Sequence, residues 1–345
     1  MGKYVVKRLL LALLTSIIIL SITFILMKML PFNKPVGTDA SIYAYYTNQV
    51  NLGFVVDLSE ENTALGEYLW KYVDPGKVTH IYYVKPIADQ YFAWLRNIVT
   101  KWDWGTSTYV MPNVSAMYII VTRIGVTISV NIVSVIISVP LGILLGIWAA
   151  LKKNKITDHV ISTLVMVFIS VPSFVIISLL MLWLAYNTGW LPTQWPSVSA
   201  PTQTRVLGYI IPVLSLSFGS ICGYCRFTRA ELCEVMSSEY LLLARTKGLT
   251  RGQSIVRHAL RNAMVPIFPS ILSEFIGILG GSMILEQLYG IPGIGRLYIT
   301  ALNASDYNVV FVDMAVFTTI SLLAGVLLDI SYGFIDPRIR MGAKK

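Results

Sequence analysis

The chain has 345 residues, of which 55% are hydrophobic and 13% are charged, and its mean hydropathy is +0.66. A soluble domain of this length cannot bury so much apolar surface in one core, so the composition excludes that class and indicates an integral membrane protein. The formal net charge of +9 predicts no nucleic-acid partner, because the basic residues lie at the ends of apolar segments, where lipid and topology account for them.

Six apolar segments are long enough to cross the ~30 Å hydrocarbon core of a bilayer as helices. They lie near residues 9–30, 119–151, 160–185, 206–225, 265–286 and 309–333. The first has an apolar stretch of about 20 residues, longer than the ~7 to 15 of a cleavable signal peptide, and no A-x-A-like site follows it. We therefore predict an all-α integral membrane protein with six transmembrane helices, the first of them retained.

Lysines and arginines predict the orientation of these spans, because cytoplasmic loops carry them in excess. They concentrate before the first span, after the second, after the sixth, and in residues 226–264, which hold seven. Residues 31–118 instead have six basic and eight acidic side chains. We expect both termini in the cytoplasm and residues 31–118 outside.

The insertion, residues 31–118, contains 17 aromatic residues, too many for a disordered linker, so we expect a small folded cap. Its residues 35–85 match no motif. Apolar residues then recur at helical spacing and predict an amphipathic helix over about 86–102, with a stripe of Ile87, Tyr91, Trp94, Leu95, Ile98 and Trp102. This stripe either packs on the membrane surface or under the cap, or forms an aromatic box that binds a ligand.

Small residues four apart let helices approach closely in lipid, where van der Waals packing drives association. Three glycine pairs have this spacing, at positions 142 and 146, 219 and 223, and 277 and 281, and predict a tight bundle. Pro140, Pro172 and Pro212 are expected to interrupt the second, third and fourth spans. Such breaks require neighbours or water to bond the freed carbonyls.

The cysteines and histidines predict no metal or redox site. The C-x-x-C of Cys222 and Cys225 has neither a second ligand pair nor a thioredoxin-like context, so we interpret both cysteines as small packing residues. The three histidines are far apart in sequence. We also predict no catalytic residue.

Carboxylates in the spans are functional candidates, because burying them in lipid costs several kcal/mol. Glu274, in the fifth span, either lines a polar pathway or makes a structural hydrogen bond between helices. Glu286, at the outer end of that span, is a second candidate for lining the pathway.

A basic, helix-prone island occupies residues 239–266. Ser237 or Ser238 can cap a first helix that has Glu239 in its first turn, and Gly248 breaks the chain. A second amphipathic helix is predicted over about 251–263, with an apolar stripe of Ile255, Val256, Ala259, Leu260 and Ala263. We interpret the island as a helical elbow that fits a groove on a cytosolic partner; the alternative is a basic surface loop.

The island resembles the coupling loop of peptide-type ATP-binding cassette (ABC) importer permeases. The patterns A-R-T-K-G-L at residues 244–249 and R-H-A-L-R-N-A-x-x-P at residues 257–266 carry the resemblance. Of the wider signature E-A-A-x3-G-x9-I-x-L-P, the chain keeps Gly248 and has Arg261 in place of the proline. In these departures the chain resembles permeases of the oligopeptide, dipeptide and nickel branch and differs from maltose-type sugar permeases.

The resemblance covers nearly the whole chain, because further blocks agree with it. They are W-G-T-S at residues 104–107, P-L-G at 140–142, P-G-I-G-R at 292–296 and D-P-R-I-R at 336–340. A retained first span followed by a long external segment is similar to the B-type permease subunit. The resemblance implies a type I importer fold in a bacterial or archaeal plasma membrane.

Partners and residue roles follow from the resemblance. It implies a homologous C-type permease that completes a heterodimer, two cytoplasmic ABC ATPase subunits, an extracellular solute-binding protein and the lipid bilayer. The chain has no G-x-x-x-x-G-K-[ST] motif and is expected to bind no cofactor, with ATP and Mg held by the ATPases. The residues expected to couple to the ATPases are Glu239, Ala244, Arg245, Lys247, Gly248, His258, Leu260, Arg261 and Asn262. In the alternative, His258, Arg261 and Asn262 only tie the elbow to the bundle.

The chain is expected to divide at residues 1–30 (first span), 31–118 (insertion), 119–336 (permease core with the coupling loop 226–264) and 337–345 (cytoplasmic tail). Oligopeptides or dipeptides are the expected cargo, with nickel chelates or oligosaccharides as alternatives. A self-sufficient secondary carrier would show an inverted repeat, and a membrane enzyme or sensor would show a catalytic constellation. We find neither in the sequence.

Overall fold

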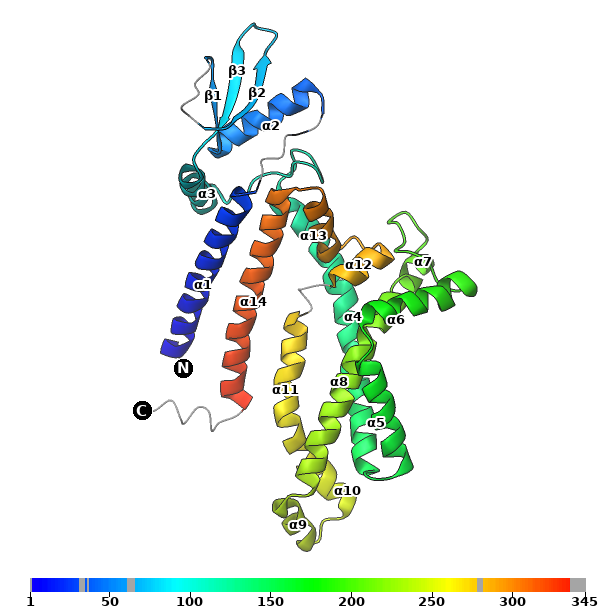
Figure 1. Cartoon of the computed structure of the whole chain (residues 1–345). Helices are drawn as coiled ribbons and strands as arrows, with labels where there is room; N and C mark the ends of the chain where they lie inside the picture. Colours follow the sequence, from blue (N-terminus) through cyan, green and yellow to red (C-terminus); the bar gives the residue numbers. More distant parts are fainter. Residues whose placement is uncertain (1, 31–34, 36, 61–65, 278–281, 336–345) are drawn as a thin grey trace. The chain divides into compact units, whose positions relative to one another are not determined.

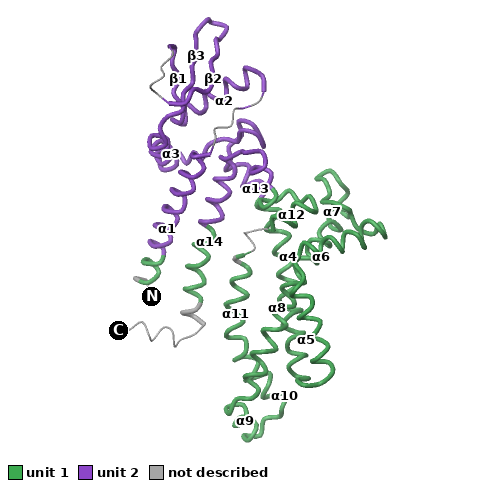
Figure 2. Tube along the Cα trace, viewed as in Figure 1, with its two compact units in different colours: residues 1–8, 124–296, 320–345 green, residues 9–123, 297–319 purple. Residues whose placement is uncertain are grey.

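A computed structural model describes residues 2–30, 35, 37–60, 66–277 and 282–335. Helices predominate in these ranges, and the chain divides into two compact units (Figure 2). The first unit comprises residues 1–8, 124–296 and 320–345, and the second comprises residues 9–123 and 297–319. Each unit therefore combines segments that are far apart in sequence.

Long apolar helices agree with a membrane-spanning chain, but the described ranges do not reach the predicted six spans. Four stretches are long and apolar enough: in α1 (Gly2–Lys28), in α4 (Ala116–Leu151), in α7 (Thr202–Leu207) with α8 (Ile210–Met236), and in α14 (Tyr307–Ile335). A fifth results if α5 (Ile156–Ile169) and residues Ser173–Asn187 count as one span.

The predicted fifth transmembrane span, 265–286, is not one helix over the described residues. α11 (Leu260–Gly277) starts in the basic island, so only part of its 18 residues is apolar. Residues 278–281 lie outside the described residues, and α12 (Met283–Tyr289) is a separate short helix. α13 (Ile294–Asn303) then precedes α14.

Of the three prolines expected to interrupt spans, only Pro172 does so. It precedes α6 (Ser173–Leu180) and the π-helical segment η1 (Met181–Asn187), and the chain bends by 97° at this break. Ser215 of α8 donates a hydrogen bond to the carbonyl of Ser173 at 2.7 Å. Pro140 instead lies inside the continuous α4, and Pro212 lies in the first turn of α8, where the missing N–H removes no helical bond.

Close packing of α4 on α8 confirms one of the predicted glycine contacts. A Cβ added to Gly142 would lie 2.8 Å from the carbonyl oxygen of Ile221, and one added to Gly146 would lie 2.7 Å from that of Cys225. The other described glycines of the predicted pairs have no heavy atom within 4 Å of an added Cβ: Gly219, Gly223 and Gly277. The contacts expected of these three are therefore not made within the described residues.

An ion pair joins α5 to α8. Asp158 is fully buried, and its two carboxylate oxygens accept hydrogen bonds from Arg229 at 2.5 and 2.8 Å. The same carboxylate accepts the backbone N–H of Asn154. Cys222 and Cys225 are buried near this pair in a cluster with hydrophobic residues of α5, as expected of packing residues.

The insertion contains a three-stranded antiparallel sheet, so the all-α prediction is wrong for this part of the chain. β1 (Val55–Leu58), β2 (Tyr68–Val73) and β3 (Thr79–Val84) pair in the order β1-β3-β2 (Figure 1). These strands are rich in aromatic and β-branched residues, which favour pleated, half-buried surfaces. α2 (Asp39–Leu52) packs on the sheet, and its Tyr46 shares a core with Val55, Leu69 and Tyr82.

α3 (Ile87–Lys101) confirms the amphipathic helix predicted over 86–102. Trp94, in the middle of the predicted stripe, is buried and stacks on Phe24 of α1 with ring centroids 4.8 Å apart. Trp102, predicted on the same stripe, is exposed at the helix end with a φ of 54°. The helix therefore packs through its middle rather than along the whole stripe.

Candidate functional site

The elbow, residues 226–264, leaves the end of α8 and returns into α11 (Figure 1). Its first arm is α9 (Glu239–Thr246), and Ser238 precedes this helix with the extended backbone expected of a cap. The Ser238 hydroxyl, however, donates to the carbonyl of Val235 and bonds no free N–H of α9. Ser238 therefore marks the helix start without capping it through its side chain, while Glu239 suits the positive end of the helix dipole.

The turn after α9 is a Schellman motif, and the sequence A-R-T-K-G-L forms it. The N–H of Leu249 donates to the carbonyl of Ala244 at 3.4 Å, and the N–H of Gly248 donates to that of Arg245 at 3.1 Å. Gly248 lies in the left-handed region with a φ of 92°. The predicted glycine break is confirmed, and the backbone conformation is its cause, because a Cβ at this position would meet no described atom within 4 Å.

The second arm begins with a capping box. The Thr250 hydroxyl accepts the N–H of Gln253 at 3.3 Å, and the Gln253 side chain accepts the N–H of Thr250 at 3.1 Å. α10 (Arg251–Ser254), the π-helical segment η2 (Ile255–Ala259) and α11 then follow without a break. The helix predicted over 251–263 therefore does not end at 263, and one continuous helix joins the elbow to α11.

A small apolar core attaches the elbow to the bundle. The buried members from the elbow and its neighbours are Ala150, Leu232, Leu241, Ile255, Ala259 and Ala263. Ile255, Ala259 and Ala263 are four residues apart and form one line, which α4 and α8 cover. Val256 lies one residue off this line and is 67% exposed, so the predicted apolar stripe divides into a buried line and an exposed apolar side chain.

The exposed side of the elbow combines apolar and basic side chains. We call this set the elbow face; its members are Leu242, Leu243, Arg245, Lys247, Arg251, Val256, Arg257, His258 and Arg261. Exposed apolar side chains with a charged rim are typical of surfaces that bind another protein. The face is thus suited to a partner rather than to water alone.

The structure separates the predicted coupling residues into different environments. Ala244 and Gly248 build the Schellman turn. Asn262 donates a hydrogen bond from Nδ2 to the hydroxyl of Tyr240 at 2.8 Å and so joins the two arms of the elbow. Leu260 is half-buried where η2 meets α11. The Asn262 bond lies within the elbow and does not tie the elbow to the bundle, and the side chains of His258 and Arg261 are exposed as members of the elbow face. The coupling roles of these three residues stay predictions.

Glu274 of α11 accepts a hydrogen bond from the Ser220 hydroxyl of α8. Tyr224, one turn further along α8, donates to the carbonyl of Ser270 at 3.2 Å. These bonds join α8 and α11 along one seam, which is the structural alternative predicted for Glu274. Its lining of a pathway stays a prediction.

Glu286 of α12 is buried and forms an anchor for the loop that follows it. One carboxylate oxygen accepts the Thr127 hydroxyl at 2.8 Å, and the other accepts the N–H of Arg296 at 2.9 Å. A Cβ on Gly293 or Gly295 would press against the Glu286 carboxylate, so the P-G-I-G-R block needs its two glycines for this approach. These contacts give Glu286 a structural role at the start of α13, and its pathway role stays a prediction.

Asp306, which the sequence analysis did not single out, has a comparable role in the second unit. It is fully buried, and its Oδ2 accepts the Ser107 hydroxyl and the backbone N–H groups of Thr108, Tyr109 and Val110 at 2.6 to 3.0 Å. Asp306 thereby fixes the W-G-T-S block, 199 residues earlier in the chain. No signal near Asp306 in the sequence indicates this contact, because its partners are so distant along the chain.

Comparison with known proteins places this arrangement in a family. Residues 142–341 match the family described as the binding-protein-dependent transport system inner membrane component. The chain belongs to this family. The matched residues include the whole elbow, Glu274 and Glu286, and they begin after the insertion.

Full-length relatives extend the similarity of this transport component across the insertion. The dipeptide transport system permease protein DppB of Lactococcus lactis subsp. cremoris is 32% identical over 99% of this chain and 100% of its own length. DppB of Bacillus subtilis is 29% identical over 100% of both chains. The oligopeptide transport system permease protein OppB of Haemophilus influenzae is 31% identical over 99% of this chain and 100% of its own.

Proposed function

We propose that the chain is the B-type permease subunit of an ATP-driven importer and forms half of a pathway for oligopeptides or dipeptides. An extracellular solute-binding protein would deliver the cargo, and a homologous C-type permease would complete the heterodimer. The elbow carries this proposal, because its exposed leucines and basic residues form a surface suited to a second protein. The peptide cargo is supported by the names of the DppB and OppB relatives.

On this proposal, the elbow face docks on one of two cytoplasmic ABC ATPases, which hold ATP and Mg. Leu242 and Leu243 would enter an apolar groove, as helix-in-groove recognition requires. Arg245 and Lys247 would contact polar groups at the rim of that groove. Ala244 and Gly248 act indirectly, since they form the turn that sets the angle between the two arms.

The continuous helix from α10 through η2 into α11 supports a lever mechanism. A displacement of the elbow by ATPase closure would be transmitted along this helix, which continues through the π-helical η2 and past Pro266 and Pro269. Glu274 lies on the same helix and bonds Ser220 of α8, so the displacement would reach the seam between α8 and α11. Two packings of this seam would then correspond to inward-open and outward-open states.

The first test concerns the ATPase partner. The chain is co-expressed with ABC ATPase subunits and a C-type permease, purified in mild detergent, and tested for co-purifying ATPases. Leu243→Glu, which places a charge in the elbow face, should lose them, whereas Val198→Glu, at an exposed apolar residue outside the elbow, should retain them. Equal retention by both variants would reject docking at the elbow.

The second test concerns cargo and class. Proteoliposomes with the complete transporter and its binding protein should take up a labelled tripeptide only when ATP is present. Uptake by the chain alone under an ion gradient would identify a self-sufficient secondary carrier instead. Uptake of a nickel chelate or an oligosaccharide, without peptide uptake, would support an ABC importer and reject peptides as its cargo.

A further inference from the structure

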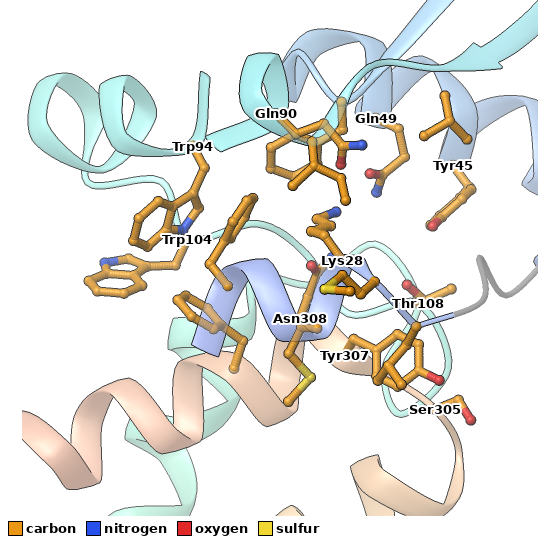
Figure 3. A pocket seen from close by; sticks show the side chains of 18 of the residues that line it. Lys28, Tyr45, Gln49, Gln90, Trp94, Trp104, Thr108, Ser305, Tyr307 and Asn308 are labelled. Carbon is orange, nitrogen blue, oxygen red and sulfur yellow. The ribbon is translucent and has the colours of Figure 1, made fainter. Parts of the chain in front are cut away.

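A cavity of about 480 Å³ lies inside the second unit (Figure 3). Its walls come from the end of α1, from α2 and α3, from the W-G-T-S block and from the start of α14. Polar and charged side chains from several of these segments line it, including Lys28, Gln49, Gln90, Trp104 and Asn308. The proposed transport function assigns no role to this cavity.

Three N–H groups at this cavity lack a hydrogen-bond acceptor among the described residues. They are Nε2 of Gln49 and the indole Nε1 atoms of Trp94 and Trp104, and each of these atoms is buried. Gln49 is 2% exposed and Trp94 is 6% exposed. Buried polar groups are nearly always bonded, so three unbonded donors around one cavity point to a ligand that supplies acceptors.

A cation is present beside these donors. The ammonium of Lys28 reaches into the cavity (Figure 3) and lies 4.1 Å from the ring centroid of Phe54 and 5.7 Å from that of Phe24. Glu67 also lines the cavity, yet Lys28 forms no ion pair with it or with any other described carboxylate. The unbonded donors and the unpaired cation together favour an anionic ligand.

Neighbouring tyrosines do not offset this charge. Tyr45 and Tyr109 line the cavity, and burial raises the pKa of both hydroxyls, so that both stay neutral at physiological pH. The lining residues therefore include one cation, Lys28, one carboxylate, Glu67, with which it forms no ion pair, and several neutral donors.

Apolar side chains also line the site, which continues onto a membrane-spanning helix. Phe24 stacks on Trp94, and Phe311 packs edge-on against Trp94 with centroids 5.4 Å apart. Leu26 and Met29, beside Lys28 at the end of α1, are exposed. Only 11% of the apolar window of α1 is buried, so lipid chains are the expected cover of this helix.

We propose that this cavity binds the phosphate headgroup of an anionic membrane phospholipid. Lys28 pairs with the phosphate, the amide of Gln49 and the indole N–H groups donate to headgroup oxygens, and the acyl chains lie along the exposed face of α1. A lysine at the end of a span is at the depth of lipid headgroups. A lipid accounts for the adjoining exposed apolar surface, which a peptide carboxylate or free phosphate would leave uncovered.

The test uses the full-length chain, delipidated in detergent and titrated with dioleoyl phosphatidylglycerol, with bound lipid counted by native mass spectrometry. Lys28→Met should weaken binding by about tenfold, which corresponds to about 1.4 kcal/mol. The matched control Lys101→Met removes an exposed lysine at the end of α3 and should bind as the parent does. Lys28→Arg keeps the charge and should bind within about threefold of the parent, the factor for roughly 0.7 kcal/mol.

Competition identifies the source of the anion. Inorganic phosphate and the tripeptide Ala-Ala-Ala, each in large excess, should leave the bound lipid in place. Displacement by phosphate would overturn the proposal in favour of a free-anion site, and displacement by the tripeptide would overturn it in favour of a carboxylate site. Equal affinity of the parent and Lys28→Met would also overturn it, as would equal binding of dioleoyl phosphatidylcholine. Should Lys28→Met fail to fold, Trp94→Phe provides the same test, because it removes one donor and keeps a ring, and unchanged affinity there would overturn the proposal.

Discussion

Gly248 offers the sharpest test of the elbow as a lever, because its backbone can be changed without a steric clash. Its φ is 92°, and an added Cβ would have no described neighbour within 4 Å. Gly248→Ala should therefore cost only the left-handed conformation itself, about 1–2 kcal/mol. Such a cost lowers the population of the native turn by a factor of about 5 to 30.

Gly248→Pro should have a larger effect than Gly248→Ala. Proline fixes φ near −65°, which the observed φ of 92° excludes. It also removes the N–H that bonds the carbonyl of Arg245 at 3.1 Å. The two arms can then no longer meet at their native angle, although the rest of the chain keeps its contacts.

Gly252 is the matched control, because it lies four residues later in the same elbow. It is in the first turn of α10, has no positive φ, and has open space around an added Cβ. Gly252→Ala should stabilise this helical turn by up to about 1 kcal/mol. Any effect specific to Gly248 therefore reports the turn and not the loss of a glycine in general.

The assay compares tripeptide uptake and ATP hydrolysis in the same proteoliposomes, with the complete transporter and its binding protein. Gly248→Pro should abolish uptake while the complex stays assembled and hydrolyses ATP. Gly248→Ala should lower peptides carried per ATP by up to about 30-fold, the full shift of the turn population, and Gly252→Ala should match the parent. Normal uptake by Gly248→Pro would refute the lever mechanism.

Three further predictions concern the packing that supports the elbow and the insertion. Gly142→Leu should destabilise the α4–α8 contact and lower the thermal midpoint in detergent, because an added Cβ meets backbone at 2.8 Å, whereas Gly219→Leu, in open space, should change it little. Arg229→Met should lower the free energy of unfolding by about 3–5 kcal/mol, because it leaves the buried Asp158 carboxylate unpaired. Denaturant titration measures this loss, and replacing Asp158 with a neutral residue in the same variant should recover part of it. Asp306→Ala should expose its loop to limited proteolysis, since four donors lose their acceptor, and unchanged cleavage would contradict that anchoring role.

Local signals in the sequence predicted much of the fold. Gly248, Pro172 and the helical periodicity of residues 86–102 each act through the backbone or through neighbours within a few residues, so the sequence around them is sufficient. The capping box at Thr250 and Gln253 is an equally local signal, because the sequence T-x-x-Q is typical of it.

Features that depend on distant partners could not be predicted in this way. Asp306 is an anchor only because its loop partners lie up to 199 residues away. The sheet of the insertion depends on pairing between strands whose aromatic content was visible but whose register was not. The apolar stripe of the second arm shows the same limit, because α4 and α8 decide which of its residues are buried and leave Val256 exposed.

Glu286 and Asp306 also qualify the rule that buried carboxylates near membrane spans indicate function. Glu286 accepts a backbone N–H in the first turn of α13, and Asp306 accepts those of a loop, so both carboxylates replace bonds that water would give outside the bilayer. Sterics also explain the two glycines of the P-G-I-G-R block, because a Cβ at either position would displace the Glu286 carboxylate. Glu286 also bonds the Thr127 side chain of α4, but Glu274 differs from both, since among the described residues it bonds a side chain on another helix and accepts no backbone N–H. A hydrogen bond between two helices can break and re-form when the helices move, whereas a backbone anchor must persist. Of the three carboxylates, Glu274 is therefore the one whose contact can change during the proposed transport cycle.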